Sequence, residues 1–220
     1  DIPNINLTIE VPEGRKIARK TWNPRLGIIN GISILGTTGI VIPYSCSAWI
    51  HSIHRGIDVA RHSKLEHIAG CTGSVSEKIT RIHYSLPEQA MIDMGDFAGG
   101  LLKYLRRNTV PRLTISGGFA KLVKLSQGSM DLHSSRSQVD IKNLQKKISL
   151  INSKIETENI LTANQALEMM GSEKYQLAES IANHAQNNVC KMLANSNIGV
   201  DIMIIDRKEE ILTKTHIKYA

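Results

Sequence analysis

The sequence is poor in cysteine and offers no framework for disulfides. Its 220 residues include three cysteines, Cys46, Cys71 and Cys190, which are odd in number, widely separated and never in a C-x-x-C pair. A disulfide-stapled secreted domain or a zinc site needs cysteines in pairs or in close spacing. We therefore interpret all three as reduced thiols, which predicts a cytoplasmic protein.

Aromatic residues and long apolar runs are also scarce. Aromatics make up 4% of the chain, which argues against binding single-stranded nucleic acid through stacked bases. No apolar run approaches the roughly 18 residues of a membrane-spanning helix. An initiator methionine and a signal peptide are missing as well, and the chain begins beside a predicted strand at 6–11. This start indicates a piece of a longer protein.

Positive charge is in excess. The formal net charge is +7 at pH 7, which favours a polyanionic partner. Nucleic acid, a membrane surface and a small molecule with several carboxylates are the candidates at this point.

One stretch, residues 23–43, organises the rest of the chain. An apolar run ending at Leu35 is followed at once by Gly36-Thr37-Thr38-Gly39, and a helical pattern begins after Pro43. A strand, a glycine turn and a helix in this order bring backbone N–H groups up to a ligand in α/β proteins. The loop lacks the phosphate-loop lysine and is not G-x-G-x-x-G. We predict a ligand loop here, the alternative being a tight turn between packed elements.

The same order recurs along the chain and predicts an α/β fold with a mostly parallel sheet and flanking helices, Rossmann-like in type. Since ligands gather at the carboxyl ends of parallel strands, we expect four turns to share one edge of the sheet: Gly36–Gly39, Gly70–Gly73, Gly95–Asp96 and Gly117–Gly118. We expect strands at 67–70, 89–94 and 112–116, with helices at 45–64, from Ser74 toward Ile82, 97–107 and 119–125.

The pattern changes after Ser134. Helical periodicity at 138–155, 162–170 and 173–193 is followed by two strands, 200–205 and 211–215, around Asp206-Arg207-Lys208-Glu209. We therefore divide the chain into three parts: 1–22 as the end of a truncated N-terminal domain, 23–135 as an α/β ligand-binding domain, and 136–220 as a helical segment with a terminal β-hairpin.

Several polar residues are candidates for local roles. Ser74 or Ser76 and, further on, Asp96 are placed to cap helices. Gly99-Gly100 inside a helix predicts close packing or close approach of a ligand, because each glycine costs about 1 kcal/mol relative to alanine. His51, His54 and Asp58 share a helix side, which we interpret as an exposed polar face, not a metal site.

Two groups carry possible chemistry. Lys121 and Lys124 lie three apart at the start of a helix, so they can point the same way and hold a carboxylate or phosphate; the alternative is two surface lysines. Asp131, His133 and Ser134 combine an acid, an imidazole and a hydroxyl, but sequence neighbours seldom form a triad and no G-x-S-x-G motif is present. A binding role in a loop is the better interpretation.

Five segments form one pattern along the chain: Asn23-Pro24-Arg25-Leu26-Gly27-Ile28, the run from Gly31 to Val41, Gly95 to Gly99, Lys121 to Leu125 with Gly128, and His133-Ser134. In these segments the chain resembles the cobalt-precorrin-5B C(1)-methyltransferases of cobalamin biosynthesis. The similarity spans about residues 7 to 145 and departs from the family pattern at Asn30, Ala120 and Leu132. The family also has an N-terminal region without a counterpart here, so the chain resembles the carboxyl-terminal two-thirds.

The resemblance implies methyl transfer from S-adenosylmethionine, as co-substrate, to ring carbon 1 of cobalt-precorrin-5B, giving cobalt-precorrin-6A. The cobalt belongs to the substrate, so no protein metal site, nucleic acid or membrane is expected, and the oligomeric state stays open, a homo-oligomer included. We expect the donor at Gly36, Thr37, Thr38, Gly39 and Asp96, and the acidic corrinoid at Arg25, Lys121, Lys124, His133 and Ser134. A nucleotide-binding enzyme that uses the turns for phosphate and a non-catalytic corrinoid-binding scaffold are the alternatives.

Overall fold

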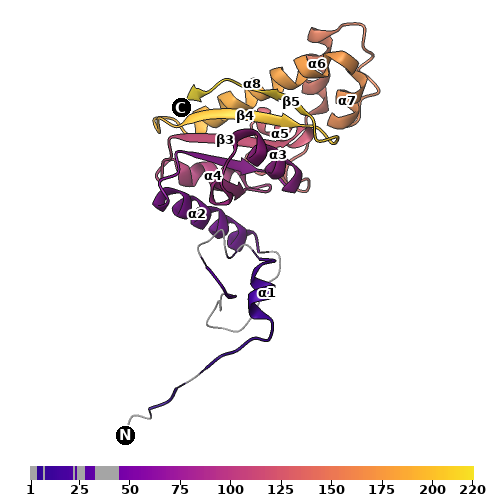
Figure 1. The fold of residues 1–220 in the computed structure, drawn as a ribbon. Coiled ribbons are helices and arrows are strands. Elements are labelled where there is room, and N and C mark those ends of the chain that lie inside the picture. The colour runs from indigo at the N-terminus through magenta and orange to yellow at the C-terminus, as the bar shows by residue number, and fades with distance from the viewer. Residues whose placement is uncertain (1–3, 7, 22, 24–27, 33–44) are drawn as a thin grey trace.

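Figure 1 shows the fold as a computed structural model. The structure describes residues 4–6, 8–21, 23, 28–32 and 45–220. The predicted loop Gly36–Gly39 and Arg25 lie outside the described residues. Among the helices described, none combines the length and apolarity needed to cross a bilayer.

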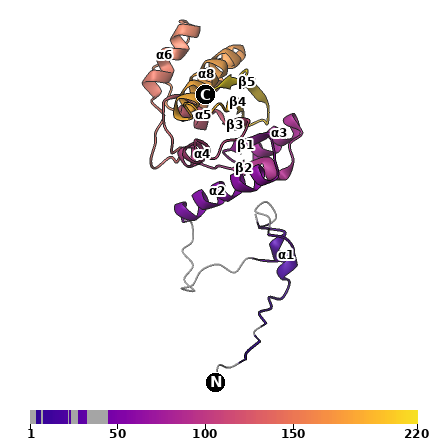
Figure 2. The same cartoon turned by 90° about the vertical axis from the view of Figure 1, so that its left-hand side faces the viewer.

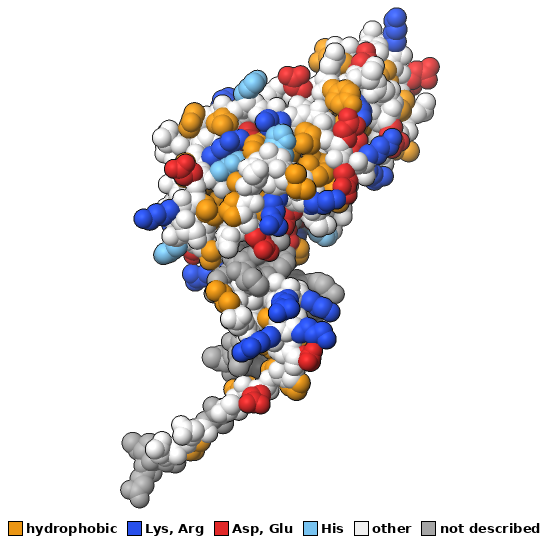
Figure 3. Space-filling view, in the orientation of Figure 1, with side chains coloured by type: hydrophobic (Ala, Val, Ile, Leu, Met, Phe, Trp, Pro, Cys, Tyr) orange, Lys and Arg blue, Asp and Glu red, His pale blue; other side chains and the backbone are white. Residues whose placement is uncertain are grey.

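In the described part of the N-terminal segment, residues Gly14–Ala18 form the short α-helix α1. The strand predicted at 6–11 is wrong, because its described residues lie outside any helix or strand. Ile9 and Val11 are 64% and 44% exposed, so no strand among the described residues buries the alternating pattern, and a strand without a partner leaves its backbone unpaired. The basic residues 15–20 lie mainly on the surface (Figure 3), as a solvated segment would.

The α/β alternation predicted from the sequence is confirmed between residues 45 and 126. Helix α2 begins at an N-cap serine, Ser45, whose side chain accepts a hydrogen bond from the backbone N–H of Ala48. The elements in order are α2 (Cys46–His62), β1 (His67–Cys71), α3 (Ser74–Tyr84), the short 3-10 helix η2 (Glu88–Ala90), β2 (Met91–Asp93), α4 (Ala98–Leu105), β3 (Arg112–Gly118) and α5 (Phe119–Ser126).

The C-terminal helices and hairpin are confirmed as well. Asp140 and Thr162 cap the helices that follow them through their side chains. The elements are α6 (Ile141–Ile151), α7 (Ala163–Met169), the 3-10 helix η3 (Gly171–Glu173), α8 (Lys174–Met192), β4 (Gly199–Ile205), β5 (Ile211–Lys214) and β6 (Lys218–Tyr219). The two-residue β6 was not predicted, since it is too short to show a periodicity.

The strands form one mixed sheet in the order β2-β1-β3-β4-β5, with β6 pairing with β4 as well. The pairs β1–β2, β1–β3 and β3–β4 are parallel, and β5 and β6 run antiparallel to β4. The predicted mostly parallel sheet is therefore confirmed. Because β4 pairs with β3, the β4–β5 hairpin belongs to the same sheet as the earlier strands. The division of the chain into three parts, with a boundary after residue 135, stays a prediction.

The two faces of the sheet differ in chemistry. Leu113 and Ile115 of β3 are fully buried in the large apolar core, to which α2, α4, α5 and α8 contribute (Figure 2). Thr114 and Ser116 alternate with them and therefore point to the opposite face, where α3 packs on β1 and β3. An apolar face and a small, polar face thus share one strand.

Two of the predicted helix caps are wrong. The N-cap of α3 is Gly73, and the hydroxyl of Ser76 donates 2.8 Å to the Gly73 carbonyl instead of accepting from a helix N–H. Helix α4 begins one residue later than Asp96 would require, with Phe97 as its N-cap. The carboxylate of Asp96 forms an ion pair with Lys121 of α5 instead of capping the helix.

Candidate functional site

The carboxyl ends of the parallel strands bring three of the predicted turns together. The backbone N–H of Gly95 donates 3.0 Å to the carbonyl of Cys71, and that of Thr72 donates 3.0 Å to the carbonyl of Ser116. The turns after β1, β2 and β3 therefore share one edge, as the sequence predicts. The fourth turn, Gly36–Gly39, lies outside the described residues.

Glycine is required by geometry at two points on this edge. Gly95 has φ +53°, in the left-handed region, and a Cβ there would lie 2.9 Å from the indole ring of Trp49. Gly117 faces the β1–α3 turn, and a Cβ there would meet the hydroxyl of Thr72 at 2.5 Å. The turns can approach this closely because Gly95 and Gly117 have no side chain.

Lys121 and Lys124 point to a common acceptor, as their spacing predicts. Their Nζ atoms donate to the carbonyl of Leu132 at 3.2 and 3.0 Å. Lys121 also forms an ion pair with Asp96, whose carbonyl accepts from the Leu132 N–H at 2.8 Å. The loop after α5 is thereby fastened to the turn after β2.

The two lysines differ in burial. Lys124 is 7% exposed, and burial, together with the nearby charge of Lys121, lowers the pKa of its ammonium. The side chain of Lys121 is 34% exposed and keeps access to solvent. Lys124 therefore fixes the loop from within, whereas Lys121 lies at the surface of the site. The predicted contact of Asp96 with a ribose hydroxyl stays a prediction.

His133 and Ser134 lie exposed in the adjoining loop. The Nδ1 of His133 accepts from the Ser135 N–H at 3.2 Å and lies 2.7 Å from its hydroxyl. The Asp131 carboxylate accepts from the backbone N–H of His133 and pairs with Arg136, so it does not orient the imidazole. These contacts favour a binding role for the His133–Ser134 loop and do not form a catalytic triad.

A crevice of about 450 Å³ opens at the same edge, beside the ends of β3 and β4. In Figure 1 the β4 arrow points to this end of the sheet, on the side where α7 lies. Phe119, Leu167 and Ile205 give it an apolar lining. Its charged lining residues are four cations and two acids: Lys121, Lys174, Arg207, Lys208, Glu168 and Asp206.

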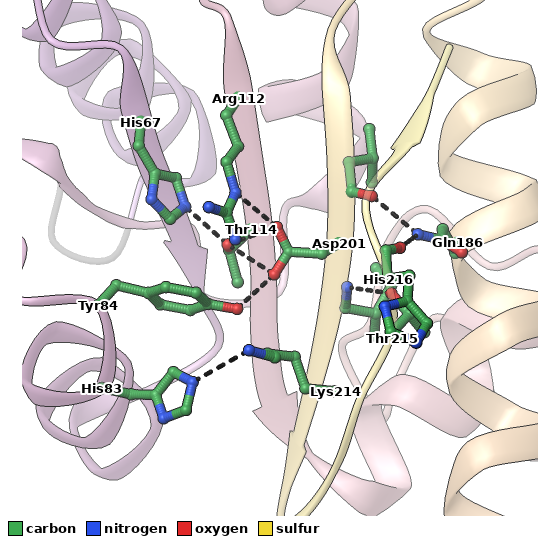
Figure 4. A network of polar contacts seen from close by, with 12 residues as sticks. His67, His83, Tyr84, Arg112, Thr114, Gln186, Asp201, Lys214, Thr215 and His216 are labelled. Atoms are coloured by element: carbon green, nitrogen blue, oxygen red, sulfur yellow. Dashed lines mark hydrogen bonds and ion pairs between the residues drawn. The ribbon is translucent and has the colours of Figure 1, made fainter.

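A second polar cluster lies toward the amino ends of the strands, under α3 (Figure 4). Asp201 of β4 is fully buried and accepts from Arg112 Nε at 3.0 Å, from the Thr114 hydroxyl at 3.0 Å and from the Tyr84 hydroxyl. The hydroxyl of Thr114 also lies 2.8 Å from Nε2 of His67. Since this hydroxyl donates to Asp201, it accepts from a protonated Nε2.

This environment shifts two pKa values. Burial, reinforced by the charge of Arg112, lowers the pKa of His67 to about 4, so the ring is neutral near pH 7. Burial and the hydrogen bond to Asp201 raise the pKa of Tyr84 above its ordinary value. Arg112 and Lys214 also lie over the Tyr84 ring, 4.9 and 5.4 Å from its centroid. Every member has a partner inside the cluster, which favours a structural role.

The helix side that carries two histidines and an acid is used for packing. His54 stacks on Tyr104 with ring centroids 4.1 Å apart, and the Tyr104 hydroxyl donates 2.7 Å to Asp58. Among the residues that the structure describes, no group of three or more His, Cys, Asp or Glu side chains is placed to hold a metal ion.

Sequence reasoning missed the crevice cations Lys174, Arg207 and Lys208. The last two were interpreted only as parts of a hairpin turn. The sequence carries no signal for their place, because the turn reaches this edge only through the parallel pairing of β4 with β3, which the structure shows.

Comparison with known proteins gives consistent matches. The sequence matches the family CbiD over residues 2–43 and the CbiD C-terminal domain over residues 131–216. It is 52% identical, over 215 residues, to a cobalt-precorrin-5B C(1)-methyltransferase of Paramagnetospirillum magneticum, covering 97% of this chain and 60% of that relative. It is 54% identical, over 212 residues, to the proteins of the same name from Brucella canis and Brucella suis, covering 94% of this chain and 58% of each relative.

The chain thus spans about 60% of the length of these relatives. No solved structure matches it.

Proposed function

Because the chain belongs to the CbiD family, we propose that the protein acts as a cobalt-precorrin-5B C(1)-methyltransferase in cobalamin biosynthesis. S-Adenosylmethionine would supply an electrophilic methyl group, which the electron pair of ring carbon 1 attacks while the carbon–sulfur bond breaks and its electron pair stays on sulfur. The products are the C1-methylated corrinoid and S-adenosylhomocysteine.

Such a displacement needs alignment of the two reactants more than an acid–base pair. One observation supports a site of this kind: the three described turns, the Lys121–Asp96 pair and a crevice with more cations than acids all lie at one edge of the sheet. Three of the segments that carry the family resemblance, 95–99, 121–125 and 133–134, converge at this edge. The other two, 23–28 and 31–41, lie mostly outside the described residues. The edge therefore offers backbone for close approach and positive charge for an acidic substrate.

The roles of Lys121 and Lys124 follow from their contacts. The ammonium of Lys121 donates to Asp96 and to the carbonyl of Leu132, and its side chain is 34% exposed, so its third N–H holds a carboxylate of the corrinoid. Lys124 supports that contact by fixing the carbonyl of Leu132, and His133 and Ser134 cover the substrate from the neighbouring loop. The remaining roles are those that the family resemblance implies: the donor at Gly36, Thr37, Thr38 and Gly39, with Asp96 at its ribose, and a further carboxylate at Arg25. Arg25 and the Gly36–Gly39 loop lie outside the described residues.

The test is binding and turnover in the full protein with Lys121→Ala. We expect the Kd for a carboxylate-bearing cobalt corrinoid to rise roughly fivefold, since one hydrogen bond to a charged group contributes about 1 kcal/mol or more. The Kd for S-adenosylmethionine should stay unchanged. Lys103→Ala, which removes an exposed lysine of α4, is the matched control.

Turnover is read from the mass of the corrinoid, which should gain one methyl group, and from release of S-adenosylhomocysteine. Binding of a nucleoside triphosphate without any response to S-adenosylmethionine would instead support a nucleotide-binding enzyme. Corrinoid binding without methyl transfer would support a scaffold. Equal loss of both ligands in Lys121→Ala would contradict the role given to this lysine.

A further inference from the structure

We infer that the crevice between α5, α7 and the β4–β5 turn is the subsite for the acidic side arms of the tetrapyrrole, with Arg207 and Lys208 as its main cations. This inference rests on the proposed function for the identity of the substrate. It adds residues that neither the sequence reasoning nor the family resemblance singled out.

The first argument is the pairing of the crevice cations. Lys121 is paired with Asp96, and Lys174 donates 2.8 Å to Glu210. Within the described part of the chain, Arg207 and Lys208 form no ion pair. Two exposed, unpaired cations at the mouth of a cavity are available to an anionic ligand.

The second argument is the way in which the turn is built. The Asp206 carboxylate accepts from the backbone N–H groups of Lys208 and Glu210 at 2.8 and 2.9 Å, so its negative charge is used to hold the turn. The carboxylate of Glu209 forms an ion pair with Lys78 at 2.9 Å. The acids beside Arg207 and Lys208 are thus engaged elsewhere, and the positive charge at the crevice is left in excess.

The opposite wall adds to this charge. The N-cap of helix α5 is Gly118, which has no side chain to cap the first turn, and a Cβ at this position would meet nothing within 4 Å. The N–H groups at a helix start favour an anion. An anion between α5 and the β4–β5 turn would therefore meet positive potential from both sides.

Charge and size together select the substrate arms over the methyl donor. S-Adenosylmethionine carries a sulfonium and an ammonium against one carboxylate, so it is a net cation and gains little in a crevice whose lining has two more cations than acids. A cavity of about 450 Å³ is too small for a whole tetrapyrrole with its acidic arms. The arms enter, while the macrocycle lies across the edge toward the Asp96 turn.

The experiment compares two corrinoids in the full protein. Cobyrinic acid has peripheral arms that end in carboxylates, and cobinamide has the same ring with amide arms. We expect Arg207→Gln/Lys208→Gln to raise the Kd for cobyrinic acid about tenfold, because two solvent-exposed ion pairs are lost, and to leave the weak binding of cobinamide unchanged. The preference of the wild-type protein for cobyrinic acid over cobinamide should also fall as the salt concentration is raised.

Arg106→Gln/Arg107→Gln is the matched control, because these two consecutive exposed arginines follow α4 at the other end of the sheet. It removes the same charge and should leave both Kd values unchanged. All variants have their substitutions at exposed positions, and circular dichroism checks that they are folded.

Three outcomes would overturn the inference: an unchanged Kd for cobyrinic acid in the crevice variant, an equal loss in the control, or loss of S-adenosylhomocysteine binding in the crevice variant with corrinoid binding retained. The last would make the crevice the donor site. If the wild-type protein transfers methyl groups and the crevice variant binds cobyrinic acid normally, the inference fails while the proposed function stands. If the tenfold loss is seen but no methyl transfer occurs, the subsite stands and the proposed function fails.

Discussion

Replacing the buried carboxylate of Asp201 by an amide should destabilise the fold strongly. Asp201→Asn keeps the shape of the side chain but removes the charge that compensates Arg112 and receives the hydroxyls of Thr114 and Tyr84 (Figure 4). One carboxylate oxygen also becomes an NH2 group. This group is itself a hydrogen-bond donor, so it cannot accept a hydrogen bond from the donors around it. Asp201 is fully buried, so water cannot replace these contacts.

The magnitude follows from the contacts. Hydrogen bonds to a charged acceptor contribute about 1.5–3 kcal/mol each and neutral ones about 1 kcal/mol, so three weakened bonds cost about 3 kcal/mol. Breaking a buried ion pair costs about 3–5 kcal/mol. The side chain of Arg112 is 29% exposed and regains some hydration, which places the expected loss near the lower end, about 3 kcal/mol.

Urea denaturation followed by circular dichroism measures this loss, with an unchanged dependence on urea as the sign that the same two states are compared. Asp131→Asn is the control, because Asp131 pairs with Arg136 at the surface, where the side chains are 31% and 58% exposed. An exposed pair of this kind contributes at most about 1 kcal/mol. The reasoning would be refuted if Asp201→Asn lost less than about 1 kcal/mol, or no more than the control.

Two further predictions test the sheet. His67 has a pKa of about 4 in the folded protein and about 6.5 in the unfolded chain. Between these pH values the unfolded chain binds a proton that the folded protein does not, so the free energy of unfolding falls as the pH drops from 6.5 to 4. In urea titrations at each pH, His67→Gln should remove roughly 2 kcal/mol of this fall, a figure reduced for the partial exposure of the ring. A parallel loss in both proteins would contradict this. Gly117→Ala should cost about 1–3 kcal/mol in the same assay, because its Cβ would lie 2.5 Å from the Thr72 hydroxyl. Gly118→Ala, which meets no atom within 4 Å, should be nearly neutral, and equal effects would show that the contact does not matter.

The fold was predictable from the sequence wherever local periodicity and turn chemistry agree. The helices predicted at 45–64, 138–155 and 173–193 are present as α2, α6 and α8, and the turns after β1, β2 and β3 share the predicted edge. The errors arise where a distant partner decides the outcome. Asp96 has the right position for a cap, but Lys121, far along the chain, takes its carboxylate.

The candidate site was predictable only in part. The spacing of Lys121 and Lys124 correctly indicates that they point the same way, yet no local pattern shows that one is buried and the other reaches solvent. The carboxylate of Asp201 sits in an apolar strand without any sequence signal, because its partners come from β3 and the end of α3. Arg207 and Lys208 could be placed only after the parallel pairing of β4 was known.

The position of β4 has a consequence for how the protein is made. This strand lies beside β3 in the sheet, but the chain between them includes the four α-helices α5, α6, α7 and α8, so the neighbour of β3 leaves the ribosome long after β3 itself. Until then β3 is an open edge with apolar side chains, and such unpaired edges invite association with other chains. The nascent chain therefore depends on the β4–β5 hairpin both to cover this edge of β3 and to complete the wall of the crevice, and deleting the hairpin should harm solubility and ligand binding together.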